Sequence, residues 1–340
     1  MQKLFQAVSH TLRSHGAAAC GVCPRRALEP CMTQRQREQL EEKMPGWRAV
    51  FCAAFPYYVN LPAPPHAISR YAWGMDYHRV LAARLSPAAK LLTESGAHAE
   101  TLVDASPVPE RTAALSAGVG MLGCHGLVIV PPYGSYVFLG TIVTDSCAFD
   151  TVSPATILHC PGCGACRAAC PSGALTGESF QMERCLSFIS QKKGDLTDWE
   201  RELLKNNHCL WGCDVCQEAC PFNRSPRETT IPEFREALIT AVTSEMLDDL
   251  TNREFQRRYG GRAFAWRGAG VLRRNLDISE IEAKGWSLTP GAYVGVAPVE
   301  DDGVNFEERM AEIHRELLTL QAESNALMDK ISQNMEEMGL

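Results

Sequence analysis

Seven cysteines in two short segments constrain the fold of this chain more than any other feature of its sequence. They are Cys160, Cys163, Cys166 and Cys170, followed by Pro171, and Cys213, Cys216 and Cys220, followed by Pro221. In the spacing C-x2-C-x2-C-x3-C-P, three thiolates bind one four-iron cluster and the fourth reaches a second cluster. Gly162 and Gly164 allow the tight turns that bring three sulfurs to one cluster face. The spacing therefore predicts two [4Fe-4S] clusters.

The exchange of the fourth cysteine, as in bacterial two-cluster ferredoxins, divides these cysteines between the clusters. One cluster receives Cys160, Cys163, Cys166 and Cys220, and the other receives Cys170, Cys213 and Cys216, with one ligand missing. Cys185 and Cys209 compete for this position. Cys209 precedes Cys213 by four residues and misses the ferredoxin spacing, whereas Cys185 opens a predicted helix that can return its thiolate, so we favour Cys185. Two zinc sites are the alternative, but this spacing suits a cluster better than a tetrahedral ion.

The other cysteines and the N-terminal sequence indicate a reducing compartment. The chain has 340 residues and 15 cysteines, and its first six residues lack the apolar stretch of a signal peptide. The best candidate for a membrane span, residues 118–130, is short and is interrupted by His125. We therefore expect a cytoplasmic protein without a membrane role. Cys20 and Cys23 are either a redox pair or core cysteines of a strand, and we favour the core.

Composition divides the chain into three predicted segments. Residues 1–150 alternate helical patterns with β-rich apolar runs at 49–55, 127–130 and 136–143, which favours an α+β protein with an α/β-type N-terminal body. Residues 151–276 form the cysteine-rich, ferredoxin-like cluster domain with its closing helices. Residues 277–340 form an acidic tail with 14 acidic and 4 basic residues, against 26 and 29 in the rest of the chain. The body without its tail is slightly basic, which leaves a nucleic-acid partner open.

The tail ends in a predicted coiled-coil-like helix. Its apolar seam alternates steps of three and four residues through Met310, Ile313, Leu317, Leu320, Ser324, Leu327, Ile331, Asn334 and Met338. Such a seam needs a partner surface. We predict that the helix pairs with itself or with another protein, and the alternative is a helix packed on its own domain.

Three further sequence blocks accompany the cysteines. They are ISRYAWGMDYH at 68–78, VDASPVPER at 103–111, and GSYVFLG at 134–140 followed by Thr144-Asp145. With these blocks the chain, from about residue 15 to 276, resembles the epoxyqueuosine reductase family. Its members are cobalamin-dependent enzymes that finish the queuosine base in tRNA and are related to reductive dehalogenases.

The resemblance implies a base-off cobalamin between the N-terminal body and the cluster domain, an external electron donor and a tRNA substrate. Opening an epoxide and releasing its oxygen as water takes electrons and protons, and by its position Asp104 is the implied proton donor. The alternative role for Asp104 is to cap the helix after Ser106-Pro107. The polar groups expected around the corrin or the substrate are Arg70, Tyr71, Tyr77, His78 and Arg111.

Two departures from the family leave a second function open. The family's Gly-Lys-Asn-Ser loop is Gly123-Cys124-His125-Gly126 in this chain, and the helical-repeat C-terminal domain that many members use on tRNA has no counterpart. A ferredoxin-like electron-transfer protein or corrinoid carrier without a tRNA substrate is therefore the alternative.

The tail resembles a different family. The sequence GWSLTPGAYVGV at 285–296 and FEERM at 306–310 are similar to the extreme C-terminus of type I restriction-modification methylase subunits. The Asn-Pro-Pro-aromatic motif of a methylase active site does not occur in this sequence. The resemblance implies a partner-binding tail rather than methylation, and recruitment to a DNA restriction complex is its alternative reading.

Overall fold

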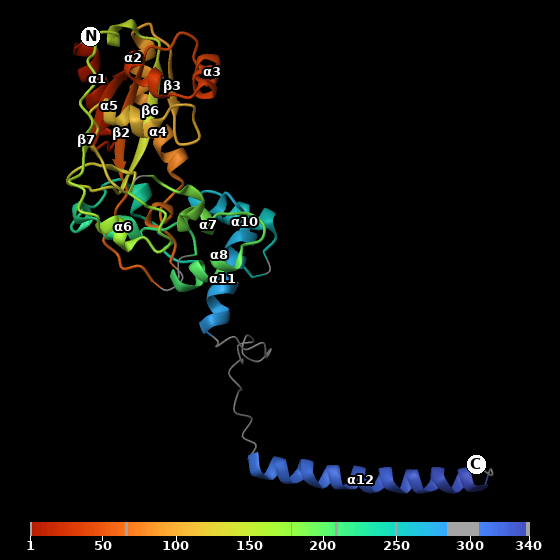
Figure 1. The fold of residues 1–340 in the computed structure, drawn as a ribbon. Coiled ribbons are helices and arrows are strands. Elements are labelled where there is room, and N and C mark those ends of the chain that lie inside the picture. The colour runs from red at the N-terminus through yellow and green to blue at the C-terminus, as the bar shows by residue number, and fades with distance from the viewer. Residues whose placement is uncertain are drawn as a thin grey trace. The chain divides into compact units, whose positions relative to one another are not determined.

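A four-stranded antiparallel sheet is the centre of the N-terminal body (Figure 1). The strands, in the order β1-β2-β6-β3, are β1 (Ala19–Pro24), β2 (Ala49–Pro56), β6 (Val137–Thr144) and β3 (Ala99–Leu102). The computed structural model describes residues 2–64, 67–177, 179–207, 210–248, 250–283 and 306–337. All three strand pairings are antiparallel. The α+β class is thus confirmed, whereas the α/β-type description of the body is wrong, because that type is built on parallel strands.

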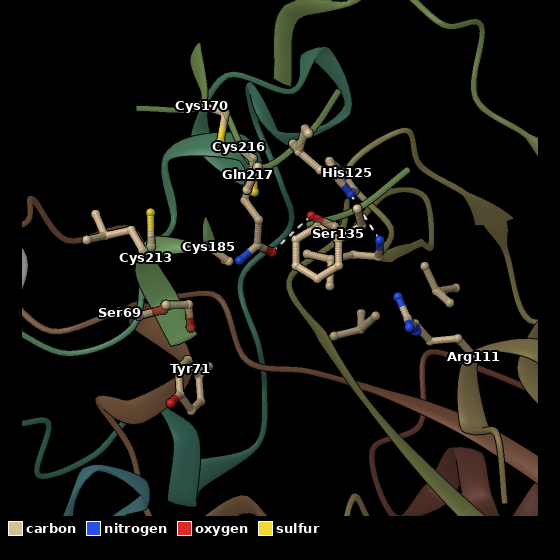
Figure 2. A pocket seen from close by; sticks show the side chains of 18 of the residues that line it. Ser69, Tyr71, Arg111, His125, Ser135, Cys170, Cys185, Cys213, Cys216 and Gln217 are labelled. Carbon is tan, nitrogen blue, oxygen red and sulfur yellow. Dashed lines mark hydrogen bonds between the residues drawn. The ribbon is translucent and has the colours of Figure 1, made fainter. Parts of the chain in front are cut away.

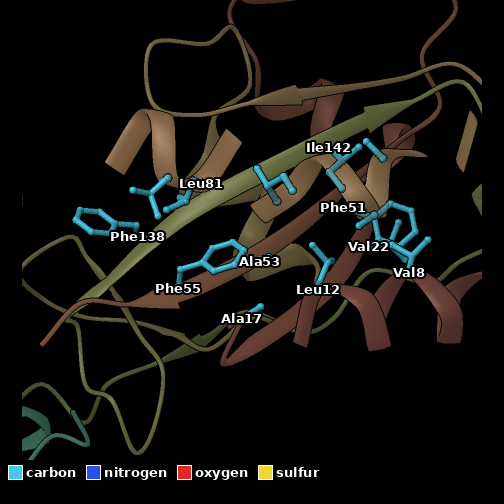
Figure 3. Close-up of a cluster of buried hydrophobic side chains, with 14 of the residues drawn as sticks. Val8, Leu12, Ala17, Val22, Phe51, Ala53, Phe55, Leu81, Phe138 and Ile142 are labelled. Atoms are coloured by element: carbon cyan, nitrogen blue, oxygen red, sulfur yellow. The ribbon is translucent and has the colours of Figure 1, made fainter. Parts of the chain in front are cut away.

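Helices cover both faces of this sheet. They are α1 (Gln2–Ser14) and α4 (Tyr77–Glu94) on one face, and α2 (Arg25–Leu28), α3 (Gln34–Lys43) and α5 (Glu110–Ser116) on the other. Successive residues of a strand point to opposite faces, so Phe51 packs with the first pair of helices and Val50 with the second group. Figure 3 shows Phe51 beside Val8 and Val22 in the first of these two cores. Covered on both sides, β2 is buried along its whole length.

Cys20 and Cys23 lie on β1 and belong to opposite faces of the sheet. Cys20 packs against the core under α1, and Cys23 is fully buried in the core under α5. Burial raises the pKa of the Cys23 thiol to about 11. The interpretation as core cysteines is confirmed, because a redox pair needs both thiols on one side.

A small sheet joins the N-terminal body to the cluster domain, which otherwise consists of short helices. The sheet has the order β5-β4-β7, with β4 (Met121–Leu122), β5 (Val128–Ile129) and β7 (Leu158–His159). The helices are α6 (Ala165–Ala169), α7 (Leu186–Ser190), α8 (Asp198–Asn207), α9 (Val215–Glu218), α10 (Asn252–Tyr259) and α11 (Ala269–Ala283). Helices α6 and α9, one from each cysteine segment, pack against each other.

The segment between β2 and α4 enters the core of the cluster domain. Ile68 and Trp73 are buried with Trp211, Phe255 and Phe264. The Ser69 hydroxyl donates to Asp214 Oδ1 at 2.6 Å, and the backbone N–H of the next residue donates to Oδ2 at 2.7 Å. The N-terminal sequence therefore contributes to the core of the cluster domain as well as to the two cores of its own sheet.

The chain divides into one compact unit at Met1–Gly285 and a second at Trp286–Leu340. Helix α11 continues across residue 277, where the composition becomes acidic, and buries Leu276 in the first unit. In the second unit, α12 (Phe306–Glu337) corresponds to the predicted tail helix. Its seam residues Leu317, Leu320 and Leu327 are exposed. The motif at 285–296, Met338 and Cys209 lie outside the described residues. Among the described helices, none is both long and apolar enough to cross a membrane.

Candidate functional site

A cavity of about 400 Å³ lies where the N-terminal body meets the cluster domain. Its lining includes Tyr71, Tyr77, Asp104, Glu110, Arg111, His125, Val137, Leu139, Cys170, Cys185, Cys213, Cys216 and Gln217. Figure 2 shows the cysteines on one side of this cavity and Arg111 on the other. Between them, the Ser135 hydroxyl donates to Gln217 Oε1 at 3.0 Å and ties the two parts together. The site thus has one thiol-rich side and one side of proton-bearing and basic groups.

Cys170, Cys213 and Cys216, the three cysteines expected to share a cluster, all line this cavity. Cys185 lines it with them, and α7 begins directly after Cys185, where the sequence predicted a helix start. The competing Cys209 lies outside the described residues.

The other four predicted ligands line a separate cavity of about 280 Å³. Cys160, Cys163 and Cys166 enter it from the first cysteine segment and Cys220 from the second. Gly162 and Gly164, at φ values of 75° and 80°, make the left-handed turns between them, which favour glycine. None of the described cysteines is in a disulfide, so each can lose its proton and bind iron as a thiolate. The predicted ligands thus line two cavities, divided as the ferredoxin exchange rule predicts.

Asp104 stands in a loop after β3 with an unusual backbone. Its φ is +58°, in the left-handed region that few non-glycine residues adopt. Its carboxylate Oδ2 accepts the Tyr77 hydroxyl at 2.5 Å and lies 3.2 Å from His78 Nε2. The other ring nitrogen of His78 lies 2.8 Å from Asp76 Oδ1. A histidine held between two carboxylates thus stands behind the aspartate that reaches the cavity.

These contacts determine where protons reside. The hydrogen bonds to Asp104 and Asp76 raise the pKa of His78 to about 9, and the contact with His78 lowers the pKa of Asp104. Burial, followed by the neighbouring carboxylate, raises the pKa of Tyr77. At neutral pH, His78 is therefore protonated and Asp104 is an ionised carboxylate.

Sequence reasoning missed Glu110, which supports the Asp104 loop. Glu110 is the first residue of α5, and its Oε1 accepts the backbone N–H of Asp104 at 2.8 Å. Burial raises its pKa to about 8. The expectation that Asp104 could cap the following helix is wrong, because α5 begins after Pro109 and has no side-chain cap. In the sequence, the only indication of a role for Glu110 was its position next to Arg111, which was expected near the corrin or the substrate.

Of the remaining residues predicted to contact the corrin or the substrate, two line the cavity and one does not. Tyr71 lines the cavity and accepts a hydrogen bond from Trp211 Nε1 at 2.8 Å. Arg111 also lines it and donates to the Gly126 carbonyl at 2.7 Å. Arg70, in contrast, is outside the cavity lining. Its guanidinium donates to the carbonyls of Val59 and Leu61 and stacks over the ring of Trp73, so it clamps a loop instead.

His125 is a second group that the sequence did not single out as functional. It lines both cavities and is only 6% exposed. Burial lowers its pKa to about 4, so the ring is neutral. Its Nδ1 accepts the Leu127 N–H at 3.2 Å, which leaves the ring proton on Nε2, and Nε2 has no hydrogen-bond partner among the described residues.

Comparison with known proteins matches segments of both the N-terminal body and the cluster domain. Residues 159–223 match the family model described as "4Fe-4S double cluster binding domain", and residues 37–105 match "Epoxyqueuosine reductase QueG, DUF1730". The epoxyqueuosine reductase of Bacillus cereus is 31% identical over 291 residues, which cover 81% of this chain and 73% of the relative. The epoxyqueuosine reductase of Gloeobacter violaceus is 35% identical over 273 residues, which cover 76% of this chain and 83% of that relative.

Solved structures have the same fold. An epoxyqueuosine reductase crystallised with an epoxyqueuosine-modified tRNA-Tyr stem loop has a TM-score of 0.71 and 26% identity, covering 83% of this chain and 82% of that one. The epoxyqueuosine reductase from Streptococcus thermophilus has a TM-score of 0.68 and 26% identity, and the match covers 82% of this chain and 81% of that one. With its double-cluster segment, its matching N-terminal body and these relatives, the chain belongs to the epoxyqueuosine reductase family.

Proposed function

We propose that this protein reduces epoxyqueuosine to queuosine in tRNA, with two [4Fe-4S] clusters and a base-off cobalamin as cofactors. One observation carries the proposal: Asp104 and the four thiols of Cys170, Cys185, Cys213 and Cys216 line the same cavity. A reductive deoxygenation needs electrons and protons at one place, and this cavity brings together the groups that deliver both. The relative that holds a modified tRNA stem loop supports tRNA as the substrate.

The proposal assigns each predicted cysteine to a cluster. Cys160, Cys163, Cys166 and Cys220 ligate one cluster, and Cys170, Cys185, Cys213 and Cys216 ligate the other. The separate cavities lined by these two sets support the assignment. An external electron donor supplies the clusters, and a reducing compartment such as the cytoplasm keeps the thiols available.

The lining of the larger cavity fits a corrin. Val137 and Leu139 of β6 and Leu127 provide an apolar surface, and Tyr71 and Arg111 provide polar groups at its edge. An apolar site with few convergent polar groups is typical of cofactor pockets. We infer that these residues hold the cobalamin, which supplies a low-potential metal centre for one-electron reduction.

The chain's own contribution to the chemistry is proton transfer. Removing the epoxide oxygen as water, with the carbon–carbon double bond formed, consumes two electrons and two protons. His78 stores a proton at Nε2, and Asp104 Oδ2 lies 3.2 Å away on the side of the cavity. We infer that Asp104 relays one of these protons from His78 to the leaving oxygen and that solvent supplies the second, while the Tyr77 hydroxyl fixes the carboxylate.

The test is turnover by the reconstituted protein. After anaerobic reconstitution with iron, sulfide and cobalamin, we expect about eight irons per chain, corrinoid that co-elutes on gel filtration, and conversion of an epoxyqueuosine-containing tRNA stem loop to the queuosine form. Eight irons without corrinoid or turnover would contradict the proposal and favour the electron-carrier alternative.

A further inference from the structure

A fifth cysteine stands at the smaller cluster cavity. Cys124 lines this cavity with Cys160, Cys163, Cys166 and Cys220. Its Sγ is 3.5 Å from the Sγ of Cys160, and its backbone N–H donates to that sulfur at 3.3 Å. The cavity therefore has one thiol more than a four-iron cluster requires.

Backbone pairing fixes Cys124 beside Cys160. Strands β4 and β7 are parallel neighbours, with Met121 opposite Leu158 and Leu122 opposite His159. The ladder continues as Cys160 N–H donates to the Leu122 carbonyl at 2.9 Å. Cys160 follows directly on this ladder and Cys124 follows one residue beyond its end, so the fold of the backbone brings the two cysteines close together.

A buried donor indicates that a group outside the polypeptide occupies the same cavity. His125, the neighbour of Cys124, is 6% exposed, and its protonated Nε2 has no partner among the described residues. A buried N–H without an acceptor costs free energy. Sulfide or thiolate sulfur of a bound cluster would satisfy it. Cys124 and His125 occupy the loop positions where the family has lysine and asparagine.

We propose that Cys124 is an alternative ligand of this cluster, able to replace Cys160. In the exchange, the iron bond to the Cys160 sulfur breaks and a bond to the Cys124 sulfur forms. The proton of the Cys124 thiol moves to the released Cys160 thiolate, and no electron is transferred. The proposal rests on the cluster assignment made above, in which Cys160 is the resident ligand.

The test compares the full-length protein with the Cys160→Ala, Cys163→Ala and Cys124→Ala/Cys160→Ala variants after anaerobic reconstitution. Iron is quantified, and alkylation of Cys124 by iodoacetamide is measured by mass spectrometry, with the exposed Cys31 as the labelling reference. We expect about eight irons in the wild type and in Cys160→Ala, and about four in Cys163→Ala and in the double variant. Cys124 should be labelled in the wild type and protected in Cys160→Ala.

Each failure has a distinct meaning. Equal labelling of Cys124 in the wild type and in Cys160→Ala, or equal iron loss in Cys160→Ala and the double variant, would overturn the ligand exchange alone. Full iron retention by Cys163→Ala would instead overturn the cluster assignment and with it the proposed function. The four irons of the other cluster report in every variant that the protein is folded.

Discussion

At the scale of single residues, Asp104 is held in a backbone conformation that costs energy. Its positive φ is supported by the Glu110 carboxyl group on its N–H and by Tyr77 and His78 on its side chain. Strained residues of this kind persist where the surroundings over-determine them, and they concentrate at functional sites. The side chain is thereby fixed toward the cavity before any substrate binds.

Replacing Asp104 by Asn should lower turnover by about 10²–10⁴-fold, because the amide cannot accept and pass on a proton. Iron content should stay unchanged, since the side chain contacts no cysteine in the described structure. The matched control is Asp150→Asn, which removes a charge that is paired with Arg48 and lies outside the cavity lining. Similar turnover by the two variants would exclude Asp104 from proton transfer.

The pH dependence of turnover should follow His78. Its pKa of about 9 in the folded protein lies above about 6.5 for free histidine, so folding favours the protonated ring. This stabilisation is complete below pH about 6.5 and is lost as the pH rises through about 9. Turnover should fall over the same upper range, because the stored proton is gone.

Comparing pH profiles of the wild type and His78→Gln checks this assignment. The variant should be slower and should lack the descending limb near pH 9. An unchanged limb in the variant would assign it to another group.

At the scale of elements, the close approach of β1 and α5 depends on one glycine. A Cβ at Gly21 would lie 2.0 Å from the carbonyl oxygen of Ala117, just beyond the end of α5. Gly21→Ala should therefore destabilise the protein by about 1–3 kcal/mol through displacement of α5. Anaerobic chemical denaturation measures the change.

The control is Gly270→Ala, which adds a Cβ to α11 where no atom lies within 4 Å. It should be neutral or stabilise by up to about 1 kcal/mol, because alanine favours the helix. Equal denaturation midpoints for the two variants would contradict the packing described here.

Local patterns predicted the elements better than their arrangement. The apolar runs at 49–55 and 136–143 correspond to β2 and β6, and α7 begins after Cys185 as expected. The antiparallel pairing of β2 with β6 joins segments far apart in the sequence, which a local pattern does not encode. Arg70 and Glu110 differ, because their partners are near in the sequence and their roles depend on the conformation of the loops that they contact, which a local apolar pattern does not encode.

At the scale of the whole molecule, the tail should be dispensable for catalysis. The first compact unit ends at Gly285 and contains every proposed ligand and the Asp104 site. Deleting residues 286–340 should leave iron content and turnover unchanged and should reduce the apparent size by more than the lost mass if α12 pairs with a second copy. Gel filtration with light scattering measures the size, and loss of iron on deletion would show that the tail belongs to the reductase.

The shared core of the first unit also has a consequence for how the protein is made. Ile68 and Trp73 lie early in the sequence, yet they are buried against Phe255, Phe264 and Leu272. During synthesis the N-terminal body emerges first and can form its sheet. These two apolar side chains lack much of their native core until α10 and α11 have left the ribosome. The nascent chain therefore exposes an apolar segment through most of its translation, which makes this segment the expected binding site for a chaperone.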